Sequence, residues 1–260
     1  SGGESDPNVI NNAVMQLKSI KQQIVDMGNT SNNGVYVFGG TNNLVKPFVV
    51  NTGDMTNGST TIANMSSVAN LTVGMAVTGA GIPDGTTITG IGANSITISN
   101  AATATLTGSG VNSYIGNTGL IKVEVNQDVT QTINIPGRHV LMPAAGDPYG
   151  TTDVFKTIDQ LIADIESSNK AGIQSGKQAL YNASIQLNAS QSDLQSRTVR
   201  VQSAAQMNQN IINTLSTVYG NVQTADYAKL GVEISQQMTA LEATLSSTAK
   251  ISQMSLLDFI

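Results

Sequence analysis

The residues that could carry out chemistry are few and lie far apart along the chain. His139 is the only histidine, it follows Gly137 and Arg138, and cysteine is absent. A hydrolytic triad needs a histidine with a nucleophile and an orienting acid, and transition-metal sites are built from several His or Cys ligands. A single histidine without any cysteine provides too few residues for such sites. We therefore expect no catalytic residues, no metal, no cofactor and no enzymatic activity.

Acidic and glycine-rich segments add no clear site. Asp153, Asp159, Asp164 and Glu166 fall within one predicted helix, and we place them on its solvent side as an ordinary charged face. Residues 79–85 come near the dinucleotide-binding fingerprint. Their third glycine is one place late, and a Thr-rich, β-like segment follows where a helix must start. We interpret this segment as a turn.

Composition and charge exclude several classes of function. The 17 acidic and 12 basic residues give a net charge of −5, and no cluster of Lys and Arg occurs, so we expect no nucleic-acid partner. No run of 18 apolar residues occurs, so we expect no membrane span. The start, Ser1-Gly2-Gly3, carries no classical secretion signal. We interpret the chain as a processed product or an expressed fragment.

The stretch that must organise the chain is a long helix predicted over about residues 177–222. Apolar residues recur there every seven positions, a heptad pattern typical of a rod packed on partner helices. The predicted seam consists of Leu180, Leu187, Leu194, Val201, Asn208, Leu215 and Val222, apolar except at Asn208. The second seam position is mostly small or polar, as in Ala183, Ser190, Arg197 and Ala204. This pattern favours a bundle of several helices over a two-stranded coiled coil. The alternative is an ordinary core helix of a large globular domain.

Helices are predicted at both ends of the chain. One starts at Asp6-Pro7 and stops at Gly28-Asn29, with a seam at Ile10, Ala13, Leu17, Ile20, Ile24 and Met27. A second is predicted from about Asp153, and residues 167–176 turn the chain into the long helix. The pattern is interrupted at residues 220–226. It then resumes in a final helix with an apolar stripe.

Between these helices the period changes to two, which predicts strands. Residues 35–38 and 47–50 form short apolar segments, and residues 120–125 and 130–135 predict a hairpin. Residues 57–110 contain one ionisable residue, Asp84, and predict a small inserted β module of short strands. The predicted fold class is α+β: an elongated helical bundle or coiled-coil rod from both chain ends with an inserted all-β region.

We divide the chain into four parts on this basis. The predicted parts are a helical rod (residues 1–33 and 152–225), a β domain (34–56 and 111–151), the inserted module (57–110) and a C-terminal assembly helix (226–260). The last helix carries the predicted subunit interface, because its apolar residues have no evident cover within the chain. These residues are Tyr227, Leu230, Ile234, Met238, Leu241, Leu245, Leu256, Leu257, Phe259 and Ile260.

Four segments together resemble the flagellin family. Residues 29–40, followed by 46–48, are similar to the family's turn from helix into its β region. Residues 114–119 with 134–137 resemble the β core, and residues 153–155 open a helix where the family has one. Residues 225–243 and 255–260 are similar to the family's C-terminus, in the branch that joins hook to filament. The segment 57–110 has no counterpart in the family pattern, and the N-terminal helix that would pair with residues 226–260 is missing.

The resemblance implies a structural subunit of the bacterial flagellum, extracellular after type III export. It implies as partners copies of the same chain, a neighbouring hook-associated protein and flagellin, with an export chaperone at the C-terminal helix. Two alternatives stay open. One is a filament flagellin, and the other is a surface-exposed binding or adhesive protein that acts through residues 57–110.

Overall fold

A computed structural model describes residues 7–126 and 128–257 of the chain, with side chains described up to residue 250. The fold is α+β, as predicted, with a long C-terminal helix and antiparallel strands. The chain divides into two compact units, Ser1–Val201 and Gln202–Ile260. Helix α4 begins in the first unit, and its later residues make up the described part of the second unit.

The described strands all lie in the first unit, together with three helices and the first part of α4. The helices are α1 (Pro7–Gly28), α2 (Arg138–Leu141), α3 (Val154–Glu166) and α4 (Lys170–Leu257). The strands are β1 (Ser31–Asn32), β2 (Val35–Tyr36), β3 (Phe48–Met55), β4 (Thr61–Ala63), β5 (Val77–Thr78), β6 (Ile88–Ile91), β7 (Ile96–Ile98), β8 (Leu106–Tyr114), β9 (Lys122–Asn126) and β10 (Val129–Thr132). The predicted hairpin is confirmed as β9 and β10, which pair antiparallel.

Six short strands form a sheet whose two edges meet. The strand order is β5-β8-β3-β4-β7-β6, and all pairs are antiparallel. The edges are joined by a bridge between Ala76 and Thr87 and by the bond from Val77 N to Thr86 O, 3.0 Å. Closure of the sheet removes the unpaired edges that would otherwise recruit another strand. We refer to residues 48–114 as the β barrel.

The barrel has its own apolar core. Buried isoleucines alternate with exposed residues along β4 and β7, as expected for strands with one face inside, and Ile88 of β6 is also buried. The core comprises Met55, Ile62, Met65, Leu71, Val77, Ile82, Ile88, Ile96, Ile98, Ala102 and Val111. Strands β3 and β8 belong to the same sheet, and the predicted module boundary at residue 110 falls inside β8. The four-part division of the chain stays a prediction.

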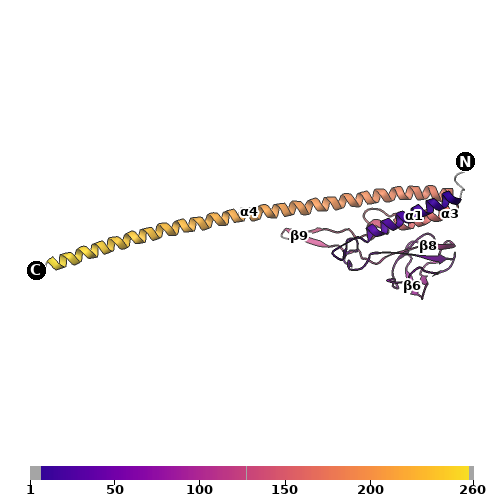
Figure 1. The fold of residues 1–260 in the computed structure, drawn as a ribbon, viewed down its shortest axis with the longest axis horizontal. Helices are drawn as coiled ribbons and strands as arrows, with labels where there is room; N and C mark the ends of the chain where they lie inside the picture. The colour runs from indigo at the N-terminus through magenta and orange to yellow at the C-terminus, as the bar shows by residue number, and fades with distance from the viewer. Residues whose placement is uncertain (1–6, 127, 258–260) are drawn as a thin grey trace. The chain divides into compact units, whose positions relative to one another are not determined.

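A second apolar core joins the helices to the base of the barrel. Phe48 of β3 contacts Phe155 of α3 edge-on, with ring centroids 5.6 Å apart, and contacts Tyr114 of β8 at 5.1 Å. Val14 and Val25 of α1 and Ile158 of α3 are buried in the same cluster. Figure 1 shows α1 and α3 side by side, with β8 and β6 on one side of the pair. This core holds the helical layer on the barrel.

Two of the expected helix boundaries are wrong. We expected residues 167–176 to be a turn, but α4 already begins at Lys170. Gly172 lies so close to Asp164 of α3 that a Cβ atom would fall 2.2 Å from its carboxyl carbon, and a Cβ atom at Gly176 would fall 2.9 Å from Leu161 Cδ1. These glycines permit close packing of α4 on α3 rather than ending the helix.

The expected interruption at residues 220–226 is also absent, because α4 is helical throughout. Gly220 costs a helix interior only about 1 kcal/mol relative to alanine, and no proline follows it. A penalty of that size does not break a helix that is favourable on both sides.

The expectation that the four carboxylates face solvent is wrong for Asp153, Asp159 and Asp164, whereas Glu166 is exposed. Asp159 and Asp164 are 6% and 5% exposed. Asp159 accepts two bonds from Lys21 Nζ of α1, at 2.6 and 2.8 Å, and one from Asn112 Nδ2 of β8, at 2.7 Å. Burial lowers the pKa of Lys21, and the neighbouring Asp159 opposes that shift. The pair therefore ties α1, α3 and the barrel together at one buried point.

We predict that replacement of Lys21 alone strongly destabilises the first unit. Lys21→Met leaves the Asp159 carboxylate buried without its cation, which typically costs about 3–5 kcal/mol. The double variant Lys21→Met/Asp159→Leu removes both charges and should recover much of that loss. Denaturant unfolding of the three proteins measures the difference. A double variant as unstable as the single one would contradict a charge-pairing role.

Candidate functional site

The predicted interface residues of the second unit lie exposed on one face of α4. Each is between 49% and 66% exposed: Tyr227, Leu230, Ile234, Met238, Leu241 and Leu245. Their spacing of three and four residues places them along a single stripe of the helix, which we call the distal stripe. The remaining predicted interface residues, Leu256, Leu257, Phe259 and Ile260, lie outside the residues whose side chains are described.

The distal stripe is free of charge. Between residues 202 and 250 the only charged residues are Asp226, Lys229, Glu233, Glu242 and Lys250, and none shares the stripe's face. The described part of the second unit consists of this one helix, so the stripe has nothing to pack against inside the unit. Monomeric proteins rarely expose a contiguous apolar surface of this kind. The distal stripe as a subunit interface stays a prediction.

A second apolar stripe precedes the first and faces another direction. Its members are Met207, Ile211, Leu215, Val218 and Val222, each between 45% and 62% exposed. At about 100° per residue, this proximal stripe is rotated by about 140° from the distal stripe. The sequence interruption at residues 220–226 is therefore a change of apolar face within a continuous helix. Two partner surfaces are needed to cover both stripes.

The predicted seam is only partly covered in the first unit. Leu180 packs on the core of the helical layer and Val201 is half-buried. Leu187 and Leu194 are 38% and 41% exposed, so within a single chain they do not form a buried seam. Leu215 and Val222 belong to the exposed proximal stripe, and Asn208 is also exposed. The seam as a contact with partner helices stays a prediction.

The face of α4 that the first unit does bury is small and polar. Ala183, Gln186 and Ser190 are 3%, 2% and 7% exposed. Gln186 Nε2 donates to Val140 O at 2.6 Å and to Thr152 O at 3.1 Å, and its Oε1 accepts from Thr152 N at 3.2 Å. Sequence reasoning missed this anchor, although the small and polar residues at the second seam position carried the signal.

Further along α4, the helix is held by charge-assisted bonds. Arg197 donates to Asp193 at 2.6 Å and to the carbonyl oxygen of Asn134 at 2.8 Å. The Tyr149 hydroxyl bonds to Asp193, and burial, followed by this acid, raises the pKa of Tyr149 to about 12. The hydrogen bond from Arg197 lowers the pKa of Asp193. These contacts position α4 and suggest no reaction.

His139 has a structural environment. It lies in α2, and its Nε2 is 3.4 Å from Oδ1 of Asp147, in the loop that follows this helix. Among the described residues, no group of three or more potential metal ligands occurs. No helix in the described ranges is both long and apolar enough to cross a membrane.

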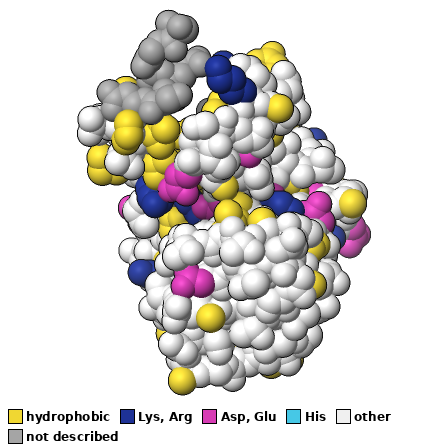
Figure 2. Space-filling view, turned by 90° about the vertical axis from the view of Figure 1, so that its right-hand side faces the viewer, with side chains coloured by type: hydrophobic (Ala, Val, Ile, Leu, Met, Phe, Trp, Pro, Cys, Tyr) yellow, Lys and Arg dark blue, Asp and Glu magenta, His cyan; other side chains and the backbone are white. Residues whose placement is uncertain are grey.

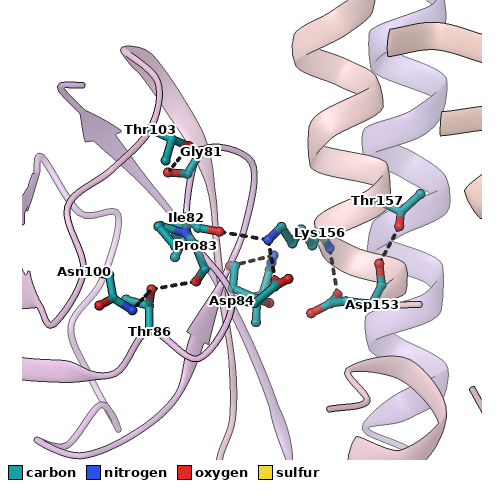
Figure 3. A network of polar contacts seen from close by, with 12 residues as sticks. Gly81, Ile82, Pro83, Asp84, Thr86, Asn100, Thr103, Asp153, Lys156 and Thr157 are labelled. Atoms are coloured by element: carbon teal, nitrogen blue, oxygen red, sulfur yellow. Dashed lines mark hydrogen bonds and ion pairs between the residues drawn. The ribbon is translucent and has the colours of Figure 1, made fainter. Parts of the chain in front are cut away.

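A polar joint connects the barrel to α3. Lys156 Nζ donates to Ile82 O at 2.9 Å and to Asp84 Oδ1 at 2.6 Å, so the single ionisable residue of segment 57–110 is used here. Figure 3 shows Lys156 reaching across from the helix to the loop that holds Ile82 and Asp84. Most charged groups visible on this side of the molecule gather near the junction, whereas the barrel below it shows few (Figure 2).

Asp153 lies beside this joint as the N-cap of α3. Its Oδ1 accepts from Lys156 N at 2.8 Å. Its Oδ2 is shielded from solvent and has no hydrogen-bond partner among the described residues. Burial raises the pKa of Asp153 to about 6, against the opposing effect of the Lys156 backbone bond. A buried oxygen without a partner is unusual, because most such atoms are paired.

Comparisons with known proteins give one distant likeness. No family model matches the chain. No curated protein matches it either. A crystal structure of FlgL from Xanthomonas campestris (space group C2) is similar, with a TM-score of 0.37, 14% sequence identity and 84% of each chain covered.

We predict that Asp153→Asn stabilises the protein at neutral pH. The folded-state pKa of about 6 exceeds the unfolded value of 3.8, so the folded chain holds the proton more tightly and loses stability as pH rises through that window. The cost above pH 6 is up to about 3 kcal/mol, and asparagine keeps the cap without it. Thermal unfolding at about pH 7.5 and about pH 5 should show a larger advantage for the variant at the higher pH.

The control is Asp26→Asn, because Asp26 is exposed on α1. Asp26→Asn makes the same change in net charge at an exposed position, so we expect its effect on stability to be the same at both pH values. An Asp153→Asn advantage of equal size at both pH values would contradict the assignment of a raised pKa.

Proposed function

We propose that this protein is a structural subunit of the bacterial flagellum that assembles through the exposed apolar face of α4. The observation that carries the proposal is the distal stripe, six large apolar side chains each about half exposed or more, on a unit whose described residues form a single helix. Burial of such side chains against other helices contributes on the order of 1 kcal/mol each. A lone helix without such packing is marginal in water.

The finer proposal is a subunit that joins hook to filament, of the hook-associated protein 3 type. It is supported by the similarity of residues 225–243 and 255–260 to that branch of the flagellin family. Its partners would be copies of the same chain, a neighbouring hook-associated protein and flagellin, with an export chaperone on the C-terminal helix before assembly. We place the assembled protein outside the cell, after type III export.

The alternative within the same class is a filament flagellin, and the two differ in where the protein lies along the flagellum. An epitope tag fits the exposed turn at residues 92–94 of the barrel. Immunogold labelling restricted to the junction between hook and filament supports the finer proposal. Labelling along the whole filament identifies a flagellin, and labelling on the cell surface away from flagella contradicts a flagellar role.

We predict that Leu241→Asp abolishes assembly, whereas Thr239→Asp does not. Leu241 lies on the distal stripe, and a charge buried there in an interface would cost several kcal/mol. Thr239 is exposed and lies two residues away, about 200° around the helix, so its replacement controls for helix propensity and net charge. Each variant is expressed in a deletion strain, and electron microscopy scores filaments on hooks. Equal filament numbers for both variants would contradict the role of the distal stripe.

A further inference from the structure

The hairpin formed by β9 and β10 has open edges. Among the described strands, β9 pairs with β10 alone, whereas the strands of the barrel close into one sheet. Figure 1 shows β9 apart from the barrel strands β6 and β8. An isolated two-stranded hairpin is at best marginally stable in water, and an exposed strand edge is a template for pairing with another chain. A further strand on this edge would therefore stabilise the hairpin.

The outer edge of β9 presents the backbone groups of Lys122 and Glu124. Ile133 N donates to Ile121 O at 2.9 Å, so the backbone of Ile121 faces the β10 side of the hairpin. Successive residues of an antiparallel strand point their N–H and C=O groups to opposite sides. The backbone of Val123 therefore also faces β10, and the backbones of Lys122 and Glu124 face away from it. The residues 122–124 are all exposed, so this edge is accessible.

The two charges on this edge select one way of pairing with a second copy of the chain. In a two-fold antiparallel pairing centred on Val123, Lys122 of each copy lies opposite Glu124 of the other. Pairings centred on Lys122 or on Glu124 would instead set like charges opposite each other. Opposite charges stabilise a cross-strand pair, whereas like charges destabilise it. Charged residues usually protect an edge strand from pairing, but in this one register they favour it.

The same register aligns apolar side chains on the other face of the strand. Ile121 lies opposite Val125 of the other copy, and the two copies of Val123 lie opposite each other. Ile133 shares this face, because it pairs with Ile121 across the hairpin. Val123 and Ile133 are 41% and 39% exposed in the single chain. The paired hairpins form a four-stranded sheet with an apolar face, which is the condition for stability that one hairpin does not meet.

We propose that the outer edge of β9 joins two copies of this chain in a two-fold dimer, with the two β9 strands paired antiparallel about Val123. Lys122 and Glu124 form ion pairs across the contact, and their backbone groups form the hydrogen bonds of the new ladder. A two-fold contact uses the same surface on both chains and closes on itself. It cannot build a filament, so the dimer is a state of the unassembled subunit and is independent of the distal stripe on α4.

Disulfide trapping in the full chain tests the register, because the chain contains no cysteine. In the proposed dimer the two copies of Val123 form a non-hydrogen-bonded pair with Cα atoms about 4.5 Å apart, a distance that a disulfide can bridge. Val123→Cys should therefore give mainly covalent dimer under mild oxidation. Thr130→Cys is the matched control, because Thr130 is exposed on β10 of the same hairpin. Its two copies would lie three strand spacings apart, about 14 Å, and should cross-link little.

Charge reversal in the Val123→Cys chain tests the ion pairs. Lys122→Glu and Glu124→Lys each set like charges opposite each other, and each should slow cross-linking by about tenfold. The double variant Lys122→Glu/Glu124→Lys restores opposite charges and should recover the rate. The two single variants change the charge beside the thiol in opposite directions. An effect on thiol reactivity alone would therefore move their rates in opposite directions.

The proposal is overturned if Val123→Cys cross-links no more than Thr130→Cys. It is also overturned if either single charge variant cross-links as fast as its parent, or if the double variant does not recover. Circular dichroism confirms that each variant is folded, and the exposed positions of the substitutions favour this. Addition of Leu241→Asp should leave cross-linking through Val123→Cys unchanged. Its loss would mean that the copies meet through α4 and not through β9, and this would contradict the proposed dimer.

Discussion

The first unit depends on the buried ion pair between Lys21 and Asp159. It is the point where α1, α3 and the barrel meet, because Asn112 of β8 shares the same carboxylate. Gly110 of β8 passes so close to Asp159 that a Cβ atom there would fall about 2.2 Å from Oδ2. Residues of α1 and β8 thus both bind the Asp159 carboxylate of α3. A buried pair of this kind adds little net stability, but it penalises every arrangement that leaves one charge unpaired.

The barrel is held in place by contacts with α3 close to this ion pair. Lys156 lies on α3, one turn before Asp159, and it reaches the only ionisable residue of segment 57–110. The barrel is therefore attached through these polar contacts and through the apolar cluster around Phe48, and two cavities open at the joint. The apolar core of the barrel and the apolar core of the helical layer stay two separate clusters.

Local features of the fold were predictable from the sequence, whereas the contacts between distant segments were not. The period of two in residues 120–135 and the capping Asp153 identify a hairpin and a helix start, because both depend on neighbouring residues. Closure of the barrel depends on bonds between residues 75–77 and 86–88, which no local pattern specifies.

The burial of Lys21 and Asp159 was missed because the partners lie 138 residues apart. The sequence predicted that α4 buries the face with Leu187 and Leu194, because these residues are apolar. The structure instead buries the neighbouring face with Gln186 and Ser190. The interface residues 227–245 were identified from their apolar period, and their role in assembly stays a prediction.

In the proposed assembly, helices of other subunits cover the exposed stripes of α4. Amide hydrogen exchange tests it most directly, comparing the full chain as a proven monomer with the same chain in its assembled state. Fast exchange through residues 227–250 in the monomer and slow exchange in the assembly is the predicted result. Slow exchange through these residues in the monomer would mean that the chain itself covers the distal stripe, and this would contradict assembly through that face.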